Sequence, residues 1–344
     1  MGYLPSPSNN MERMWTAMTR IVGVDAGGSK TYAVLVDERG NLLGTGLAGR
    51  GNHQSAGIHA ALSQIKKSIE LALQEAALSW DDIDYFQYGL AGADRDKDYD
   101  ILRPALAALP CRNWGLVCDT MEGLRVGSSD YTGVVLVCGT GTNAAGRNPQ
   151  GQSVQTGGFG FLYGDGAGGS DMAIATFRAA VRSWELRESP SLLTDLVPRH
   201  LGYDTMEQLW NDYLDKDIYS VPAHLTLVLH DAADQGDEAA GSILAQTGRE
   251  LGLAAISVIR RLGGFEELAK IPIVLVGSIL TKGRSPHLLK ALSDTLEQEN
   301  LAYELVIPEA APVYGAVMIA MDTLGIEIDD GMKQKFIQYG GHDK

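Results

Sequence analysis

The chain has 344 residues, of which 45% are hydrophobic and 21% charged, and its formal net charge is −15 at pH 7. This length predicts two domains, each large enough to build its own core. The acidic balance argues against nucleic-acid binding, which needs a basic surface. It does not exclude a phosphate-bearing ligand, because backbone N–H groups and a bound cation can hold phosphates on an acidic protein.

The N-terminal segment, residues 1–19, is predicted to be a flexible extension. It carries no apolar run typical of a signal peptide, and no stretch of the chain is apolar over a membrane-spanning length. Three cysteines without a CxxC pair indicate neither a disulfide framework nor a zinc site. These features predict a cytoplasmic protein that does not bind membranes.

The first structural feature is a β-branched run over 21–25 that leads directly into a glycine turn. A second apolar run follows at 32–36 and ends in a polar reverse turn, so the segment predicts a strand, a turn, a strand and a hairpin. Glycines let backbone N–H groups approach oxygen anions, and hydroxyl groups add donors. The turn therefore predicts a phosphate contact. Its residues are Gly27, Gly28, Ser29, Lys30 and Thr31.

This turn is not a Walker A loop. Ser29 stands where that motif has a glycine before the lysine, and the segment after it reads as a strand rather than a helix. Taken alone, the turn could equally be an ordinary hairpin connection.

An α/β pattern follows along the chain. Apolar residues at helical spacing predict a helix over 58–77, and further elements are a strand at 85–90, a helix over 99–109 and a strand at 116–118. Strands that alternate with helices indicate an α/β domain.

The first glycine turn has a counterpart more than 110 residues later. An apolar run over 133–138 leads into a second small, hydroxyl-rich turn and a second polar hairpin, which suggests an internal repeat. Two such turns could hold the phosphates of one nucleotide from both sides. The second turn contains Gly139, Thr140, Gly141 and Thr142, followed by Asn143.

The rest of the chain is mainly helical between 172 and 261, with strands at 273–276 and 305–307 and a terminal helix over 313–324. Four acids lie in or beside glycine-containing turns at the ends of strands, where open α/β sheets bind ligands. Any one of them could instead form a turn or cap a helix. Phosphorylation of a hydroxyl group needs a carboxylate to orient the nucleophile and another to hold Mg²⁺. The four acids are Asp25, Asp94, Asp119 and Asp165.

Together these residues resemble the sugar kinase/Hsp70/actin superfamily, and within it the BadF/BadG/BcrA/BcrD-type ATPase branch that includes N-acetylglucosamine kinases. The resemblance covers about residues 21–324. The motifs that carry it are the first phosphate motif at 25–31, the second at 139–143, the adenosine motif at Gly277 and Ser278, and the amino-sugar loop at 51–53.

The resemblance implies an α/β fold of two ribonuclease-H-like (actin-like ATPase) domains of duplicated ancestry, with an interdomain cleft. We expect an N-terminal ATPase domain over 20–127, to which a helix at 311–325 returns. A C-terminal ATPase domain is expected over 128–310, with a tail at 326–344.

The resemblance also implies ATP-dependent phosphorylation of an amino sugar, with N-acetylglucosamine as the expected substrate and ATP and Mg²⁺ as cofactors. Asp119 occupies the position of the catalytic base, and Asp25 is expected to organise the Mg²⁺ ion. The partner is a small-molecule sugar, and a homodimer is left open. The expected sugar contacts are Asn52, His53, Asp94, Asn143, Phe159 and Asp165.

Two departures from the family pattern leave the exact sugar open. The family segment Gly-Asp-Glu-Gly-Ser is replaced here by residues 164–168, which read Gly-Asp-Gly-Ala-Gly, so an acid is missing at Gly166. Phe159 stands where the family often has tryptophan near the sugar.

Two alternatives to a kinase remain. The same branch contains ATPases that activate dehydratases through an iron–sulfur cluster held by cysteines, but Cys111, Cys118 and Cys138 suit small core residues better. The other alternative is a sugar sensor without turnover.

Overall fold

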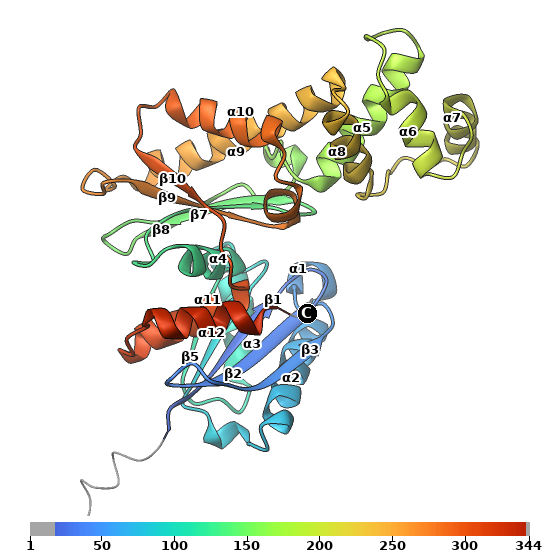
Figure 1. Cartoon of the computed structure of the whole chain (residues 1–344). Coiled ribbons are helices and arrows are strands. Elements are labelled where there is room, and N and C mark those ends of the chain that lie inside the picture. The colour runs from blue at the N-terminus through green and yellow to red at the C-terminus, as the bar shows by residue number, and fades with distance from the viewer. Residues whose placement is uncertain (1–17, 342–344) are drawn as a thin grey trace, which may run out of the picture. The chain divides into compact units, whose positions relative to one another are not determined.

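The computed structural model describes residues 18–341 (Figure 1). Two compact units divide the chain: unit 1 contains the chain up to Glu122 together with the segment from Glu309 onward, and unit 2 contains Gly123–Pro308. Residues 1–17 of the predicted N-terminal extension lie outside the described residues.

Unit 1 is built on a five-stranded mixed sheet with the order β3-β2-β1-β4-β5. The first three strands are antiparallel neighbours, whereas β4 and β5 run parallel to β1. The carboxyl ends of the three parallel strands therefore meet at one edge. The strands are β1 (Arg20–Ala26), β2 (Thr31–Asp37), β3 (Leu42–Ala48), β4 (Tyr85–Leu90) and β5 (Trp114–Val117).

Helices cover the faces of this sheet at short range, and glycines on the strands make that approach possible. A Cβ atom on Gly46 would lie 1.8 Å from a carbonyl oxygen of α2, and one on Gly23 would lie 2.8 Å from Val317 of α11. The helices are α1 (His53–Ala56), α2 (Ile58–Glu75), α3 (Asp96–Ala107), α4 (Asp119–Gly127), α11 (Pro312–Leu324) and α12 (Asp330–Tyr339), with a short 3₁₀ turn η2 (Trp80–Asp82).

Unit 2 repeats the sheet of unit 1. Its order, β10-β9-β6-β7-β8, is the order of unit 1 read from the opposite edge, so β6 corresponds to β1 and β9 to β4. The antiparallel and parallel pairings match as well. The strands are β6 (Gly133–Cys138), β7 (Thr142–Arg147), β8 (Ser153–Thr156), β9 (Ile271–Val276) and β10 (Tyr303–Val306).

Unit 2 also carries a helical insertion between β8 and β9. Its longest helix, α9, packs against α10 so closely that a Cβ atom on Gly248 would lie 2.1 Å from the carbonyl oxygen of Leu288. The inserted helices are α5 (Gly169–Trp184), α6 (Leu193–His200), α7 (Met206–Asp215), α8 (Leu225–Asp234) and α9 (Glu238–Leu262), after a short turn η3 (Phe161–Tyr163). A π-helical turn, η4 (Ile279–Gly283), and α10 (Pro286–Glu297) connect β9 to β10.

The duplicated α/β architecture expected from the sequence is confirmed. The strand at 85–90 and the helices near 58–77 and 313–324 also lie where they were predicted. Four helices were not predicted: the short α1, α4, α10 and α12, the last of which lies in the segment assigned to a tail. Within the part of the chain that the structure describes, no helix is long and apolar enough to cross a bilayer.

Candidate active site

The first glycine turn connects β1 to β2, and its backbone faces open space. Gly27 N donates to the Lys30 carbonyl at 2.8 Å, which closes the turn. A Cβ atom on Gly28 would meet no heavy atom within 4 Å, and Gly28 does not adopt a positive φ. The protein itself therefore does not require glycine at this position. A ligand that lies directly against the backbone would require it.

The second glycine turn, between β6 and β7, has the same property. Added Cβ atoms on Gly139 and Gly141 would also meet nothing within 4 Å, and neither residue has a positive φ. Gly139 N donates to the Gly141 carbonyl at 3.0 Å. Both turns thus offer open backbone, as a phosphate contact needs.

The N-terminus of α5 is attached to this second turn. Gly169 N donates to Gly139 O at 2.8 Å, and Ser170 N donates to Thr140 O at 3.0 Å. The positive end of a helix dipole favours a nearby anion. A helical region from 172 onward was predicted, but the sequence gives no sign that its first turn lies against residues 139 and 140.

Not every predicted hydroxyl donor is available. Thr31 Oγ1 donates to Gly49 O at 2.8 Å, and Thr142 Oγ1 donates to Val137 O at 3.1 Å. Ser29 and Thr140 are exposed on their turns. The exposed hydroxyls are therefore the stronger candidates for a ligand contact.

Three of the predicted acids lie at the carboxyl edge of the unit 1 sheet. Asp25 is on β1, Asp94 follows β4, and Asp119 is the first residue of α4. Cys118 Sγ lies 3.4 Å from Asp94 Oδ1 and 3.2 Å from Asp119 Oδ1, so these two carboxylates flank one thiol. The fold thus brings together acids that are far apart in the sequence.

Burial and nearby negative charge raise the pKa values of Asp25 and Asp119. Loss of hydration raises the pKa of Asp25 to about 7, and the nearby charge of Asp119 adds to the rise. Loss of hydration also raises the pKa of Asp119, with a further contribution from Asp94. A carboxylate with a raised pKa accepts a proton more readily than an ordinary aspartate does.

A fourth acid at this edge was not predicted from the sequence. Glu122 of α4 is fully buried, and neither of its carboxylate oxygens has a hydrogen-bond partner among the described residues. Gly89 of β4 makes room for it, because a Cβ atom there would lie 1.8 Å from Glu122 Oε1. Burial, with Asp25 and Asp119 nearby, raises the pKa of Glu122 well above its usual value.

The loop at 49–52 lies against the first turn, where Gly51 N donates to Gly27 O at 3.0 Å. The side chain of Asn52 accepts from Gln54 N at 2.8 Å and caps α1. Gln54 Nε2 in turn lies 3.4 Å from Asp94 Oδ2. The structure therefore places Asn52 and Asp94 near one another, on the same edge as the acids.

His53 has a structural partner. Its ring is buried, and Nε2 lies 3.4 Å from Asp98 Oδ1. A sugar contact for His53 stays a prediction.

Two of the predicted sugar residues of unit 2, Asn143 and Asp165, line a cavity of about 230 Å³, whereas Phe159 does not. Asp165 is buried and accepts from the backbone N–H groups of Gly158 and Gly160. Asn143 Oδ1 is buried without a hydrogen-bond partner among the described residues. Phe159, 41% exposed, lies on the same glycine-rich segment.

Gly277 follows β9 at a close crossing with β6. Its φ is +92°, and a Cβ atom would lie 2.3 Å from Cys138 O. The backbone thus requires glycine here whether or not a nucleoside binds, and the adenosine contact of Gly277 and Ser278 stays a prediction.

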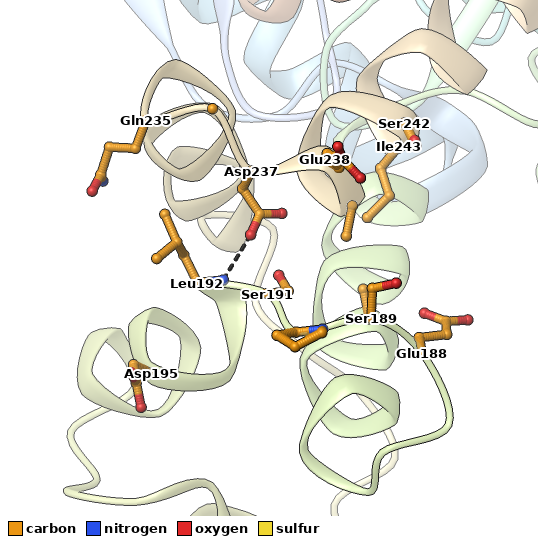
Figure 2. A pocket seen from close by; sticks show the side chains of 14 residues that line it. Glu188, Ser189, Ser191, Leu192, Asp195, Gln235, Asp237, Glu238, Ser242 and Ile243 are labelled. Atoms are coloured by element: carbon orange, nitrogen blue, oxygen red, sulfur yellow. Dashed lines mark hydrogen bonds between the residues drawn. The ribbon is translucent and has the colours of Figure 1, made fainter.

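A larger cavity of about 910 Å³ lies in the helical insertion of unit 2 (Figure 2). Asp237 accepts from Leu192 N at 2.6 Å and from Ala240 N at 2.8 Å, so it caps α9 and fixes the α5–α6 connection. The cavity contains none of the site residues predicted from the sequence.

No group of three or more histidine, cysteine or acidic side chains within residues 18–341 could hold a metal ion. Mg²⁺ binds through one or two carboxylates plus substrate phosphates and water, so Asp25 beside an open phosphate turn fits that ion. Cys118 and Cys138 are buried, as expected of core residues.

A duplicated sheet with an open glycine turn after the first strand of each copy defines a two-domain ATPase of the actin and sugar kinase type. The chain belongs to the BadF/BadG/BcrA/BcrD ATPase family, whose model matches residues 22–320. Membership in an ATPase family implies that the protein uses ATP.

Two relatives with assigned functions are similar over most of the chain. An N-acetylmuramic acid/N-acetylglucosamine kinase from Clostridium acetobutylicum is 26% identical over 309 residues, covering 88% of this chain and 98% of the relative. An N-acetyl-D-glucosamine kinase from Dictyostelium discoideum is 26% identical over 323 residues, covering 88% of this chain and 98% of the relative.

Solved structures show the same fold. A candidate N-acetylglucosamine kinase from Chromobacterium violaceum superposes with a TM-score of 0.64 at 23% identity, covering 88% of this chain and 99% of the other. A ROK family glucokinase from Streptomyces griseus gives a TM-score of 0.53 at 15% identity, covering 88% and 98%.

Proposed function

We propose that this protein is an ATP-dependent kinase that phosphorylates an amino sugar, with N-acetylglucosamine as its substrate. The observation that carries the proposal is the group of acids at the carboxyl edge of unit 1, where Asp119 has a raised pKa. The open glycine turns and the two similar kinases support it.

Both units contribute residues that are proposed to bind the nucleotide. The backbone of residues 27–31 and 139–142 binds the phosphates of ATP, and the end of β9 at Gly277 and Ser278 contacts the nucleoside. Asp25 would hold Mg²⁺, an ion that proteins bind through one or two carboxylates together with substrate phosphates and water. The bound ion supplies positive charge that offsets the charge of the phosphates.

Asp119 acts as the general base. A sugar hydroxyl oxygen attacks the γ-phosphorus of ATP, the bond from that phosphorus to the bridging oxygen breaks, and ADP leaves. The hydroxyl proton passes to the Asp119 carboxylate. The raised pKa of Asp119 suits this role, because the carboxylate holds the proton more strongly than an ordinary aspartate does.

Each unit, taken by itself, carries residues that we propose as sugar contacts. Asn52 and Asp94 contribute from unit 1, and Asn143 and Asp165 from unit 2. The unpaired amide oxygen of Asn143 supports this assignment, because a buried acceptor without a donor is costly unless a ligand completes it. Phe159 offers an apolar face to the sugar ring, and His53 is the least supported contact because Asp98 already faces it.

The alternative of a dehydratase activator receives no support from the cysteines. Cys118 and Cys138 are buried in separate units, and Cys118 lies between two carboxylates. A cluster shared by two chains needs accessible thiols.

The test is a panel of sugars with purified protein and Mg·ATP, with ADP release measured by a coupled assay and the product identified by mass spectrometry. We expect phosphorylation of N-acetylglucosamine, and its loss in Asp119→Asn. ATP hydrolysis without any sugar phosphate would contradict the proposal.

A further inference from the structure

Glu250, in the middle of α9, packs its carboxyl group onto the backbone at Gly166. A Cβ atom on Gly166 would lie 2.7 Å from Glu250 Cδ and 2.9 Å from Oε2. Gly166 has no positive φ, so its backbone conformation does not require glycine. Glycine at position 166 instead makes room for the Glu250 carboxylate.

The Glu250 carboxylate is fixed in this position. Its Oε1 atom accepts from Gln246 Nε2 at 2.8 Å, one turn earlier on α9. The side chain is half-buried, and its Oε2 atom is the one held nearest to Gly166. The Glu250 side chain thus occupies the space that a side chain at position 166 would fill, and glycine leaves that space free.

This carboxylate lines the cavity of about 230 Å³ that also contains Asn143 and Asp165. The cavity lies below the roughly 300–1,000 Å³ of sites for drug-sized ligands, which suits a single sugar ring. Asn143 provides a buried amide oxygen that lacks a donor among the described residues. The cavity is therefore built for a small ligand that carries hydroxyl or amide N–H groups.

The ionisable side chains that line the cavity are all acidic. Its lining contains two carboxylates, Asp165 and Glu250, and no lysine, arginine or histidine. The guanidinium group of Arg261 is near but engaged, because it donates to Gln155 O at 2.6 Å and to Thr156 Oγ1 at 2.8 Å. A ligand that carries its own carboxylate would meet like charge here.

We infer that Glu250 is a specificity-determining residue that restricts the substrate to amino sugars without a carboxylate group. This inference rests on the proposed function. The name of one relative covers two sugars, N-acetylglucosamine and N-acetylmuramic acid. They differ by a lactyl ether that bears a carboxylate, and Glu250 selects the uncharged one, because like charges placed together suppress the wrong ligand.

The test compares the two sugars in the wild type and in Glu250→Gln, which removes the charge and keeps the shape. In the wild type, kcat/KM with Mg·ATP should favour N-acetylglucosamine, and in Glu250→Gln the ratio should shift toward N-acetylmuramic acid by about tenfold. The matched control is Glu238→Gln, an exposed acid at the start of the same helix, which should leave the ratio unchanged. Thermal unfolding of each variant checks that it is folded.

Binding without ATP separates this inference from the proposed function. Calorimetry should show tighter binding of N-acetylglucosamine than of N-acetylmuramic acid to the wild type, and a smaller difference in Glu250→Gln. This result would support the inference even if no sugar were phosphorylated, in which case the kinase proposal alone would fail. Equal binding of both sugars to the wild type, no binding of either, or an unchanged ratio in a folded Glu250→Gln variant would overturn the inference.

Discussion

The two sheets have the same strand order but different chemistry at the ends of their strands. Asp25 pairs in register with Tyr32, one residue before the turn of unit 1, and the matching position of unit 2 is Val137, paired with Asn143. After the next parallel strand, unit 1 has Asp94, whereas residues 277–285, which follow β9 in unit 2, contain no acid. The shared feature is the open glycine turn, whereas the acids at the carboxyl ends of β1, β4 and β5 have no counterparts at the ends of β6 and β9.

This difference teaches how a duplicated domain divides its work. A turn that binds phosphate through backbone N–H groups requires a particular backbone conformation, but the side chains around it can vary. Proton transfer needs a carboxylate at one place, and a second carboxylate in the equivalent place would only repel the phosphates. We therefore expect loss of an acid in unit 1 to affect the reaction, and a changed turn in unit 2 to affect nucleotide binding.

The largest effect should come from Asp119→Asn, which removes the base of unit 1. We expect kcat to fall by about 10²–10⁴-fold, the usual contribution of a general base. Nucleotide affinity should be nearly unchanged, because the phosphate turns are intact. Steady-state kinetics and calorimetry with an ATP analogue measure the two quantities. Wild-type turnover in this variant would contradict the assignment of the catalytic base to unit 1.

The next effect should come from Gly141→Ala in the turn of unit 2. The new methyl group meets no protein atom, so the melting temperature should hold or rise slightly, while ATP affinity falls by about 1.5–3 kcal/mol as charge-assisted hydrogen bonds are lost. Gly277→Ala is the contrasting variant, because its Cβ atom would lie 2.3 Å from Cys138 O and should destabilise the fold. Unchanged ATP binding in a folded Gly141→Ala protein would show that this turn does not contact phosphate.

A smaller effect is expected for Asn52→Ala, which tests whether unit 1 contributes to sugar selection as well as to catalysis. Loss of its hydrogen bonds should cost about 1–3 kcal/mol in sugar binding and raise the sugar KM accordingly. The KM for ATP should stay constant. If the sugar KM does not change for any sugar in the panel, this loop has only a structural role.

The smallest effect concerns the pH dependence of stability. The pKa of Asp25 is 3.8 in an ordinary environment and about 7 in the fold, so the folded state binds more protons than the unfolded state between these values. Stability of the ligand-free protein should therefore fall as pH rises from about 4 to 7 and level off above that range. Asp25→Asn should flatten this slope and raise the melting temperature at pH 8, by about 2–4 °C for each kcal/mol.

Thermal unfolding across this pH range measures the change. An equal slope in the variant would show that Asp25 is not the group responsible, and Glu122→Gln would then be the next variant to examine.

Local patterns explain why much of the fold could be predicted. The apolar spacing of α2, the β-branched runs of β1 and β6 and the glycine turns after them are all readable within a few residues. The helices α10 and α12 were missed, because the first follows an irregular π-helical turn and the second has a largely polar surface with one fully buried aromatic, Phe336.

The candidate site could be predicted only where a motif names it. Asp119 and the turn residues belong to short motifs. The positions of Glu122 and Glu250 depend instead on contacts with residues that are distant in the sequence. Glu122 depends on the missing side chain of Gly89, and Glu250 on that of Gly166. A sequence shows a glycine, but it does not show which distant carboxylate fills the space.

The attachment of α11 to β1 has a consequence for how the protein is made. The sheet of unit 1 is complete in sequence by Val117, yet the helix that packs against Gly23 does not begin until Pro312. On the ribosome, every residue of unit 2 is therefore synthesised before unit 1 can cover that face of its first strand. Because domains tend to fold as they emerge, unit 2 can finish while unit 1 still exposes apolar strands. A nascent chain halted before α11 should therefore be more open to chaperones and proteases than the full-length chain, in which α11 covers β1.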